Sequence, residues 1–464
     1  MAASTLITNG TVVSAEGQYL ADVLLSGEKI VAVGHVAPPD GTTVVDASGC
    51  FVLPGLIDNH THLSMPFMGM MSCDDYDTGT RAAAAGGVTC IVDFAIQRQP
   101  DDLHSALAEW QARADGAAHI DYGFHMAITN ASEPTLDDMA AMVEAGVCSF
   151  KLFMAYKGEL MARDDALMAC MERARDLSAL TMVHAENGDV IDLLVTRALA
   201  AGHTSAVHHA LTRPEFAEAE ATSRAARLAE HTGAPLFVVH VTCEAAAVEV
   251  EAAQRRGAHV SGETCTQFLV NTIADLRRPG VESCRYICSP PLRDAANHEP
   301  LWAYVRRGVL ESVSTDHCPF RDEQKARGLD DFSLVPNGLA VIQHRLGKLW
   351  DEGVVAGRIT PSQLVDRTST TIARRFGLHE KGAITPGKDA DVVVFDPNAP
   401  RPYGVATSLM NVDYDLYEGE TASGSVRHTF SRGTLVYDRG EICSQPGHGR
   451  YVARTLSPRP ADTA

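Results

Sequence analysis

The 464-residue chain contains no pair of cysteines spaced as CxxC. Thiolate zinc sites usually take their ligands from such pairs, so a cysteine-ligated zinc site is disfavoured. The 11 cysteines are better explained as reduced thiols of a cytoplasmic protein. Two further absences agree with that location. The first residues lack the basic and apolar segments of a secretory signal, and no apolar run approaches the roughly 20 residues of a membrane span.

Basic residues are scarce relative to acidic ones. The chain carries 39 Lys and Arg against 59 Asp and Glu, which gives a formal net charge of −20. This charge would repel nucleic acids and anionic membranes, and we expect neither as a partner. Two common motifs are also missing. No GxGxxG follows the first predicted strand, which disfavours a dinucleotide-binding sheet, and Ser289 precedes a proline and lies in no GxSxG, which disfavours a serine nucleophile.

The two ends of the chain resemble each other and differ from the middle. Both contain short β-type runs broken by Gly, Asn and Asp, such as LITNGTVV in the first part and ADVVVFDP in the last. Neither end has enough strands for a core of its own. We therefore predict that residues 1–53 and 381–464, the latter including a tail, form one small β-sandwich domain. Residues 54–380 are expected to form a separate metal-dependent barrel.

The middle of the chain alternates apolar, β-branched runs with helical stretches rich in Ala, Glu and Arg, a pattern typical of a parallel α/β sheet. Eight such units are the number that a (β/α)8 barrel requires. We therefore predict an α/β protein with a TIM-like barrel. The eight runs are residues 51–60, 88–94, 120–128, 147–155, 180–186, 236–242, 259–264 and 310–316.

Metal-ligand side chains recur near the ends of five of these runs. They are His60 and His62 at the first run, Lys151 in the fourth, His184 in the fifth, His240 in the sixth and Asp316 in the eighth. A single histidine in an apolar strand is more often a hydrogen-bonded core residue. The carboxyl ends of barrel strands meet at one face, however, so these six side chains should converge. The convergence predicts a metal site.

Imidazole and carboxylate ligands without thiolate favour zinc, with manganese, cobalt or iron as alternatives. Six ligands are too many for one tetrahedral ion and suit two ions about 3.5–4 Å apart, which would share a hydroxide and polarise a carbonyl group. Lys151 has two interpretations. Burial beside metals would leave a neutral amine that could react with carbon dioxide to give a bridging carbamate, or the lysine could bind an anionic substrate.

A set of motifs in a fixed order extends over nearly the whole chain, and it resembles the dihydropyrimidinase/D-hydantoinase family of the amidohydrolase superfamily. The motifs are GLIDNHTHL (55–63), DDYDTGTRAAAAGGVT (74–89), SFKLFMAYKG (149–158), VHAENG (183–188), HVTCEAA (240–246), SGETCTQFL (261–269), CSPPLR (288–293), STDHCPF (314–320), VPNG (335–338) and MNVDYDLYEG (410–419).

The resemblance implies a role for each site residue. His60, His62 and Asp316 would bind one zinc ion, and His184 and His240 the other, with a carboxylated Lys151 and a hydroxide bridging the two Zn²⁺ of each subunit. Asp316 would also transfer protons, and Tyr156 would donate its hydroxyl to the oxyanion. Ser289 and Asn337 would hold the planar ureide, largely through backbone groups. Met65, Phe153 and Leu160 would form the pocket for the ring substituent.

The implied reaction is hydrolysis of a ring C–N bond in a small cyclic ureide, giving an N-carbamoyl amino acid. The family is also commonly tetrameric, so a homotetramer is expected. The loop after His62, LSMPFMGMMSCDDYD, departs from the family pattern at Ser64 and at Met68-Gly69. Its methionines would make an adaptable apolar wall. The substrate therefore stays open between a dihydropyrimidine such as dihydrouracil and a 5-substituted hydantoin.

Other functions compete with this one. An allantoinase, a dihydroorotase or another cyclic ureide hydrolase would use a similar site, and a dihydroorotase would need an arginine near the mouth, for which Arg293 is a candidate. A phosphotriesterase-like hydrolase can use the same six ligands, but CSPPLR and VPNG argue against it. A non-catalytic scaffold of the collapsin-response-mediator kind would be marked by lost ligands, whereas all six are present here.

Overall fold

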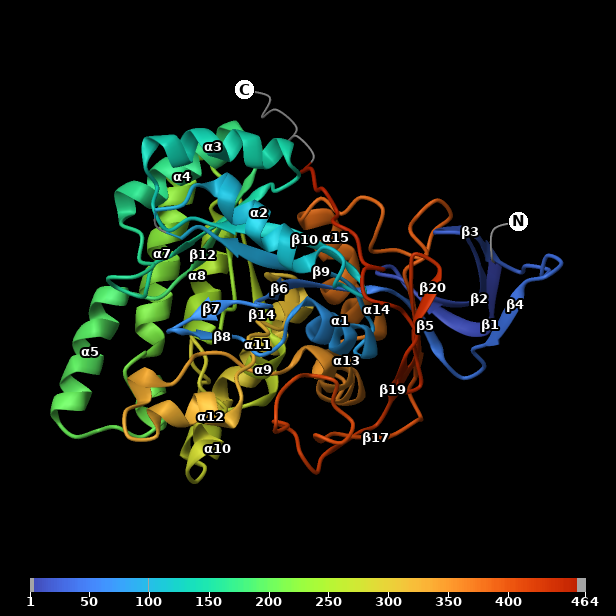
Figure 1. Ribbon diagram of the computed structural model, residues 1–464. Helices are drawn as coiled ribbons and strands as arrows, with labels where there is room; N and C mark the ends of the chain where they lie inside the picture. Colours follow the sequence, from blue (N-terminus) through green and yellow to red (C-terminus); the bar gives the residue numbers. More distant parts are fainter. Residues whose placement is uncertain (1–3, 99, 457–464) are drawn as a thin grey trace.

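Eight parallel strands form the centre of the molecule. The computed structural model describes residues 4–98 and 100–456, and Figure 1 shows these strands among helices, with a second sheet at one end. The strands lie side by side in chain order, and Thr61 pairs with His317 just beyond the last strand, which nearly closes the ring. They are β6 (Leu56–Thr61), β9 (Val88–Ile96), β10 (Asp121–Ala127), β11 (Ser149–Phe153), β12 (Leu180–His184), β13 (Leu236–Val238), β14 (Val260–Cys265) and β15 (Leu310–Ser314).

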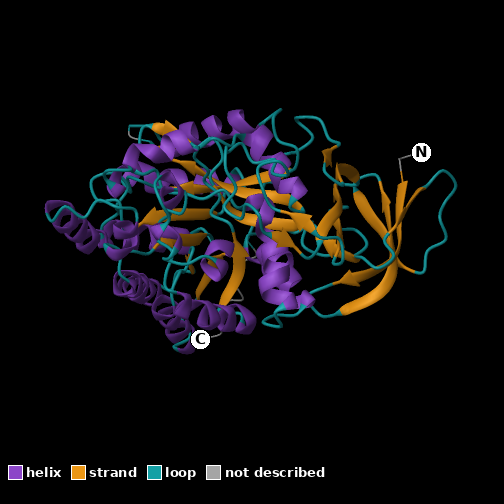
Figure 2. Ribbon diagram, turned by 90° about the horizontal axis from the view of Figure 1, so that it is seen from below, coloured by secondary structure: helices purple, strands orange, loops and turns teal. Residues whose placement is uncertain are grey.

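Helices connect these strands and cover the outside of the ring (Figures 1 and 2). The helix α7 shows how the sequence specifies them, because its buried alanines recur every four residues and Gly233, at φ 69°, ends it. The predicted (β/α)8 barrel is confirmed. The covering helices are α1 (Tyr76–Ala85), α2 (Leu103–Ala114), α3 (Glu133–Glu144), α4 (Asp164–Asp176), α5 (Gly188–Ala200), α7 (Glu215–Thr232), α8 (Glu244–Arg255) and α11 (His298–Arg307).

Shorter elements fill the long connections. Most of them lie between β15 and the second sheet, where the chain forms single turns rather than long helices. They are β7 (Pro66–Phe67), β8 (Met70–Met71), α6 (Val207–Leu211), α9 (Thr266–Val270), α10 (Val281–Cys284), α12 (Asp322–Lys325), α13 (Arg345–Leu349), α14 (Pro361–Val365) and α15 (Thr371–Arg375), with 3₁₀ turns at 275–277, 295–297, 326–328, 332–334 and 342–344 and π turns at 350–355 and 366–370. No helix among the described residues is long and apolar enough to cross a membrane.

A nine-stranded sheet is assembled from both ends of the chain. Its strand order is β21-β20-β19-β16-β5-β1-β2-β3, with β4 beside β1, and the antiparallel pair of β5 and β16 joins the two ends. The limits of the predicted domains at residues 53 and 380 stay a prediction. The strands are β1 (Ser4–Val13), β2 (Gln18–Ser26), β3 (Lys29–Gly34), β4 (Thr43–Asp46), β5 (Phe51–Pro54), β16 (Val392–Asp396), β19 (Ser425–Ser431), β20 (Thr434–Asp438) and β21 (Glu441–Ile442); β17 (Arg401–Pro402) and β18 (Thr421–Ala422) pair separately.

The first predicted strand run, residues 51–60, is two strands rather than one. Phe51–Pro54 pairs in the nine-stranded sheet, whereas Leu56–Thr61 pairs with β9 in the barrel. Gly55 lies between them, packed so closely that a Cβ atom there would lie 2.1 Å from the Thr89 hydroxyl oxygen. The apolar run hides this break, because residues on both sides of Gly55 are buried, and Leu53 and Leu56 even share one hydrophobic cluster.

The last described residues run back under the barrel. Tyr451 pairs with Tyr122 of β10, and Arg454 is fully buried. The Arg454 guanidinium donates to the carbonyl of Phe124 and, at 3.0 Å, to the Ser149 hydroxyl. Residues 451–454 therefore fill the end of the barrel opposite the strand ends that carry the predicted metal ligands. The expected tail, residues 457–464, lies outside the described part of the chain.

Candidate metal centre

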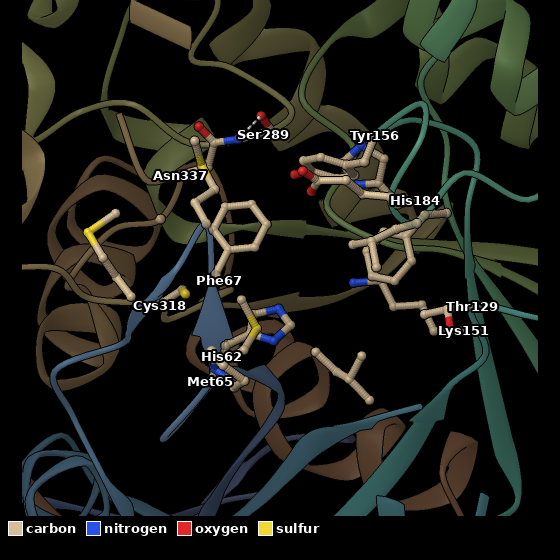
Figure 3. A pocket seen from close by; sticks show the side chains of 18 of the residues that line it. His62, Met65, Phe67, Thr129, Lys151, Tyr156, His184, Ser289, Cys318 and Asn337 are labelled. Atoms are coloured by element: carbon tan, nitrogen blue, oxygen red, sulfur yellow. Dashed lines mark hydrogen bonds between the residues drawn. The ribbon is translucent and has the colours of Figure 1, made fainter. Parts of the chain in front are cut away.

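The structure brings all six predicted metal ligands together in one place. Each is at most 9% exposed. His60 and His62 come from the end of β6, and His184 is the last residue of β12, while His240 and Asp316 follow β13 and β15 by two residues. Lys151 lies in the middle of β11 and points toward the same centre (Figure 3). The strand-end argument therefore places these side chains correctly.

Distances between the ligand atoms are short. The Asp316 Oδ1 atom lies 3.0 Å from Nε2 of both His60 and His62. The Lys151 Nζ atom lies 3.1 Å from His60 Nε2. On the other side, His184 Nδ1 and His240 Nε2 are 3.0 Å apart. One ligand atom each from His60, His240 and Asp316 lies within 4.8 Å of the other two. The residues around Asp316 and the pair His184–His240 therefore form a single cluster.

The protonation states suit metal binding. Burial lowers the pKa of His62 to about 4 and that of His240 well below its usual value, so both imidazoles are neutral at pH 7. Burial opposes the ionisation of Asp316, but the imidazoles of His60 and His62 outweigh it and hold the pKa of this carboxyl well below its usual range. Burial also lowers the pKa of Lys151 to about 8. His62 and His240 thus offer lone pairs and Asp316 a carboxylate charge, as a cation site requires. Burial opposes protonation of His60, but the carboxylates of Asp316 and Glu263 raise its pKa.

Two buried nitrogen atoms also lack a protein partner. They are Nδ1 of His62 and Nδ1 of His240, and neither has a hydrogen-bond partner within the described residues. Unpaired buried polar atoms are costly and rare in folded proteins. In both histidines the other ring nitrogen, Nε2, faces the cluster. The two unpaired nitrogens are not the candidate ligand atoms. It is the close approach of the Nε2 atoms of His62 and His240 to Asp316 and His184 that fits cation binding better than a hydrogen-bonded core.

Two carboxylates that the sequence prediction did not assign orient the histidines. Glu263 Oε1 lies 2.6 Å from His60 Nδ1, and Glu186 Oε2 lies 2.8 Å from His184 Nε2. Each carboxylate accepts the imidazole N–H, so the other ring nitrogen keeps its lone pair toward the cluster. Glu263 lies in the seventh strand run, within the sequence SGET (261–264). An acidic residue inside a predicted buried strand was the signal that could have identified it as part of the site.

Three residues around the cluster have backbone conformations that residues other than glycine rarely adopt. The φ angles are 64° at Tyr156, 42° at His240 and 49° at Asp316. Such conformations cost about 1–3 kcal/mol each and persist where the surrounding structure enforces them. Two ligands and the residue predicted to bind the oxyanion share this strain. It aims their side chains at the centre at the expense of local stability.

A cavity of about 740 Å³ opens onto the cluster, and all of the predicted substrate-binding residues line it. Figure 3 shows that Asn337 and Ser289 lie together across the cavity from Lys151, joined by a hydrogen bond of 3.0 Å from Asn337 Nδ2 to the Ser289 hydroxyl. The β7–β8 hairpin supplies an apolar wall. The predicted residues are Met65, Phe153, Tyr156, Leu160, Ser289 and Asn337, and the additional wall residues of the hairpin are Phe67, Met68, Met70 and Met71.

Arg293, the alternative candidate for binding a substrate carboxylate, is directed elsewhere. Its guanidinium donates to Glu218 at 2.7 Å and to the Thr242 hydroxyl at 2.9 Å, and it is 7% exposed. It does not belong to the residues that line the 740 Å³ cavity in the described structure. A dihydroorotase function therefore loses the residue on which it depended.

Comparison with known proteins agrees with this geometry. The sequence profile of the Amidohydrolase family matches residues 51–436. The chain belongs to the amidohydrolase family. It is 44% identical over 452 residues to the D-hydantoinase of Geobacillus stearothermophilus, covering 97% of this chain and 96% of the relative. It is 38% identical over 458 residues to the dihydropyrimidinase of Rattus norvegicus, covering 97% and 88% respectively.

Solved structures place this amidohydrolase in the same branch. It superposes on the dihydropyrimidinase from Brevibacillus agri NCHU1002 with a TM-score of 0.97 and 46% identity, covering 98% of this chain and all (100%) of the other. For the D-hydantoinase from a Thermus sp. the TM-score is 0.95 at 36% identity, with 97% and 99% covered. The resemblance to the dihydropyrimidinase/D-hydantoinase family, predicted from the ordered motifs, is confirmed.

Proposed function

We propose that this amidohydrolase is a zinc-dependent enzyme that opens the ring of dihydropyrimidines or 5-substituted hydantoins and releases N-carbamoyl amino acids. Its class is that of a hydrolase acting on the C–N bonds of cyclic amides. One observation supports the proposed substrate and metal in particular. Four histidines, an aspartate and a lysine meet at the base of a cavity whose opposite wall holds Ser289 and Asn337.

The residues divide into two groups of ligands. His60, His62 and Asp316 would hold one zinc ion, and His184 and His240 the other. Lys151, with a pKa lowered to about 8 by burial, has a neutral amine available for reaction with carbon dioxide, and the carbamate would bridge the two groups. When bound, the two ions supply positive charge that polarises the substrate carbonyl and eases the deprotonation of water.

Asp316 is suited to move protons. Its carboxylate is ionised and buried at the base of the cavity, beside His60 and His62. We propose that it accepts a proton from the attacking water and delivers it to the departing ring nitrogen. An amide nitrogen leaves poorly as an anion, so this delivery is needed for the C–N bond to break. The positive φ of Asp316 directs its side chain toward His60 and His62 at the base of the cavity, which supports this role.

Tyr156 is suited to stabilise the oxyanion. It lines the cavity and packs against His184, with the two ring centroids 5.3 Å apart. Burial raises the pKa of Tyr156, so its hydroxyl stays protonated and can donate a hydrogen bond throughout the reaction. Ser289 and Asn337, which lie near the Tyr156 hydroxyl and across the cavity from Lys151, would hold the ureide. The planar ring is thus expected to lie between these two residues and the ligand cluster.

The apolar wall is the part of the site that would select the ring substituent. Met65, Phe153 and Leu160 line the cavity beside the methionines of the β7–β8 hairpin. Methionine side chains are flexible and polarisable, so this wall can adapt to aliphatic or aromatic groups. It favours 5-substituted hydantoins over the unsubstituted dihydrouracil ring. The cytoplasmic location and the homotetramer stay predictions, drawn from the cysteines and from the family resemblance.

The test is a comparison of kcat/KM for zinc-loaded protein on dihydrouracil, hydantoin, 5-phenylhydantoin, allantoin and dihydroorotate. We expect the substituted hydantoin to be opened fastest and dihydroorotate slowest. A protein that prefers allantoin would be an allantoinase instead. A protein that retains zinc but opens none of the five rings would refute the proposed function.

A further inference from the structure

Lys325 is a buried cation outside the metal centre, and no step of the proposed reaction uses it. It is the last residue of α12 and is fully buried, at 0% exposure. Its Nζ atom donates to three backbone carbonyls, those of Ile287 at 3.1 Å, Pro336 at 2.7 Å and Gly338 at 2.8 Å. These bonds use all three of the N–H groups that an ammonium has.

The three carbonyls belong to the segments that carry the proposed ureide-binding residues. Residues 287–289 end in Ser289, and residues 336–338 have Asn337 at their centre; we call them the two binding segments. They also contact each other directly, since Gly338 N donates to Ile287 O at 2.9 Å and Asn337 Nδ2 donates to the Ser289 hydroxyl at 3.0 Å (Figure 3). Lys325 is thus the common hydrogen-bond donor to both segments from outside the cavity.

Two other buried lysines, Lys381 and Lys348, have carboxylate partners, whereas Lys151 belongs to the candidate metal cluster. Lys381 lies 2.7–3.2 Å from three aspartates, and Lys348 lies 2.5 Å from Glu420. Carboxylates are the usual compensation for a buried charge, because burial without them is costly. The three hydrogen-bond partners of Lys325 are neutral carbonyls instead. A charge kept in this setting polarises the peptide groups that it contacts.

The geometry of the peptide unit shows which groups are polarised. The bond between Pro336 and Asn337 is trans, so the Asn337 N–H points opposite to the Pro336 carbonyl, away from Lys325. Within the described residues this N–H has no hydrogen-bond partner. Asn337 itself lines the cavity. A cation on the carbonyl oxygen draws electron density through the peptide and makes this N–H a stronger donor.

We propose that Lys325 is a positioning residue for the substrate. It fixes the two binding segments and polarises the Asn337 N–H, which donates to an oxygen of the bound ureide. The inference rests on the proposed function, because it assumes that the two binding segments hold a planar ureide. It predicts that losing the ammonium weakens the binding of substrate and product more than it slows the chemical step.

The direct test compares Lys325→Met and Lys325→Gln with the wild type, all loaded with zinc. We expect KM, and the Kd for the N-carbamoyl product measured by calorimetry, to rise roughly tenfold, the equivalent of one lost charge-assisted hydrogen bond. The kcat should stay within about threefold and the zinc content should not change. Lys348→Met is the matched control, since it removes a buried lysine outside the cavity. If Lys325→Met does not fold, Lys325→Gln, which keeps two N–H donors, carries the test.

The pH dependence gives a second readout. Burial lowers the pKa of Lys325 to about 8, while burial raises the pKa of the four facing thiols and lowers that of the facing imidazole. Lys325 is therefore the member of this group that titrates near pH 8. The wild-type KM should rise above about pH 8, and Lys325→Gln should have a high KM without this component. The facing groups are Cys73, Cys284, Cys288, Cys318 and His209.

Two outcomes would overturn the inference. One is a folded, zinc-loaded Lys325→Met or Lys325→Gln variant whose KM and product Kd stay within about twofold of wild type. The other is a Lys325→Gln variant with the same alkaline rise in KM as the wild type. A wild-type protein that opens none of the cyclic ureides would refute the proposed function instead, so the two failures are distinguishable.

Discussion

We predict that the carboxylate of Glu263 controls how tightly the group formed by His60, His62 and Asp316 holds a metal ion. It is fully buried, and its Oε1 atom lies 2.6 Å from His60 Nδ1. Its Oε2 atom accepts from the Asn59 side-chain amide. Both partners are donors, so an ionised Glu263 satisfies them and keeps the lone pair of His60 Nε2 directed at the cluster. Loss of such an orienting carboxylate typically costs 10- to 100-fold in metal affinity.

Two substitutions of Glu263 should fall at opposite ends of this range of lost metal affinity. In Glu263→Gln the side-chain oxygen can still accept from His60, and its NH₂ can donate to Asn59 once that amide rotates, because Asn59 Oδ1 has no partner among the described residues. Only the charge is lost, and we expect about a tenfold weaker affinity for zinc, or about 1.4 kcal/mol. Glu263→Ala removes both acceptors and leaves a void, so we expect about 100-fold, or about 2.8 kcal/mol.

Zinc affinity would be measured by competition with a chromophoric chelator at fixed pH, together with kcat at saturating zinc. Glu311→Gln is the matched control, since Glu311 is a mostly buried carboxylate in the neighbouring strand that pairs with Arg375 rather than with a histidine. At saturating zinc the Glu263 variants should recover most of their activity. The reasoning is refuted if Glu263→Ala binds zinc within about threefold of wild type, or if Glu311→Gln weakens zinc binding equally.

The remaining predictions concern Lys151, Tyr156 and the bound metal. Lys151→Ala should lose zinc and activity, with partial rescue by a short carboxylic acid; full zinc content and rate in this variant would exclude the bridging role. Carboxylation of metal-free protein should become faster as pH rises through about 8, because burial lowers the Lys151 pKa to that value and only the neutral amine attacks carbon dioxide; ¹³C NMR of the carbamate tests this, and a pH-independent rate would contradict it. Tyr156→Phe should lower kcat roughly 10²-fold with KM little changed; an unchanged kcat would remove Tyr156 from the mechanism. Removing the metal with a chelator should abolish hydrolysis and lower Tm, since a ligand that binds the folded state stabilises it; full activity after removal would exclude a metal mechanism.

The barrel and the positions of the six candidate ligands were predictable because each rests on a local pattern. Apolar strand runs recur with helices between them, and a ligand such as His184 or Asp316 lies at a position fixed by the end of its own run. The motifs then supplied the roles. Glu263 was not assigned, because its partner His60 lies 203 residues earlier in the sequence. No local sequence pattern indicates which histidine Glu263 contacts.

Two other features depended on tertiary structure in the same way. The break at Gly55 separates two buried strands within one apolar run, and it becomes visible only when the two halves pair in different sheets. Lys325 lies in a four-residue helix within a long connection that has no periodicity. Its burial follows from the meeting of segments near residues 287 and 336, which α11, β15 and α12 separate in the sequence.

The return of residues 451–456 under the barrel has a consequence for how the protein is made. A ribosome releases β5 long before β16, its partner, and Arg454 emerges after all eight barrel strands, although it fills the floor of a barrel whose first strand begins at Leu56. The edge of β5 that pairs with β16 therefore stays unpaired until β16 has been synthesised. We expect the floor of the barrel to close only once residue 454 has left the ribosome.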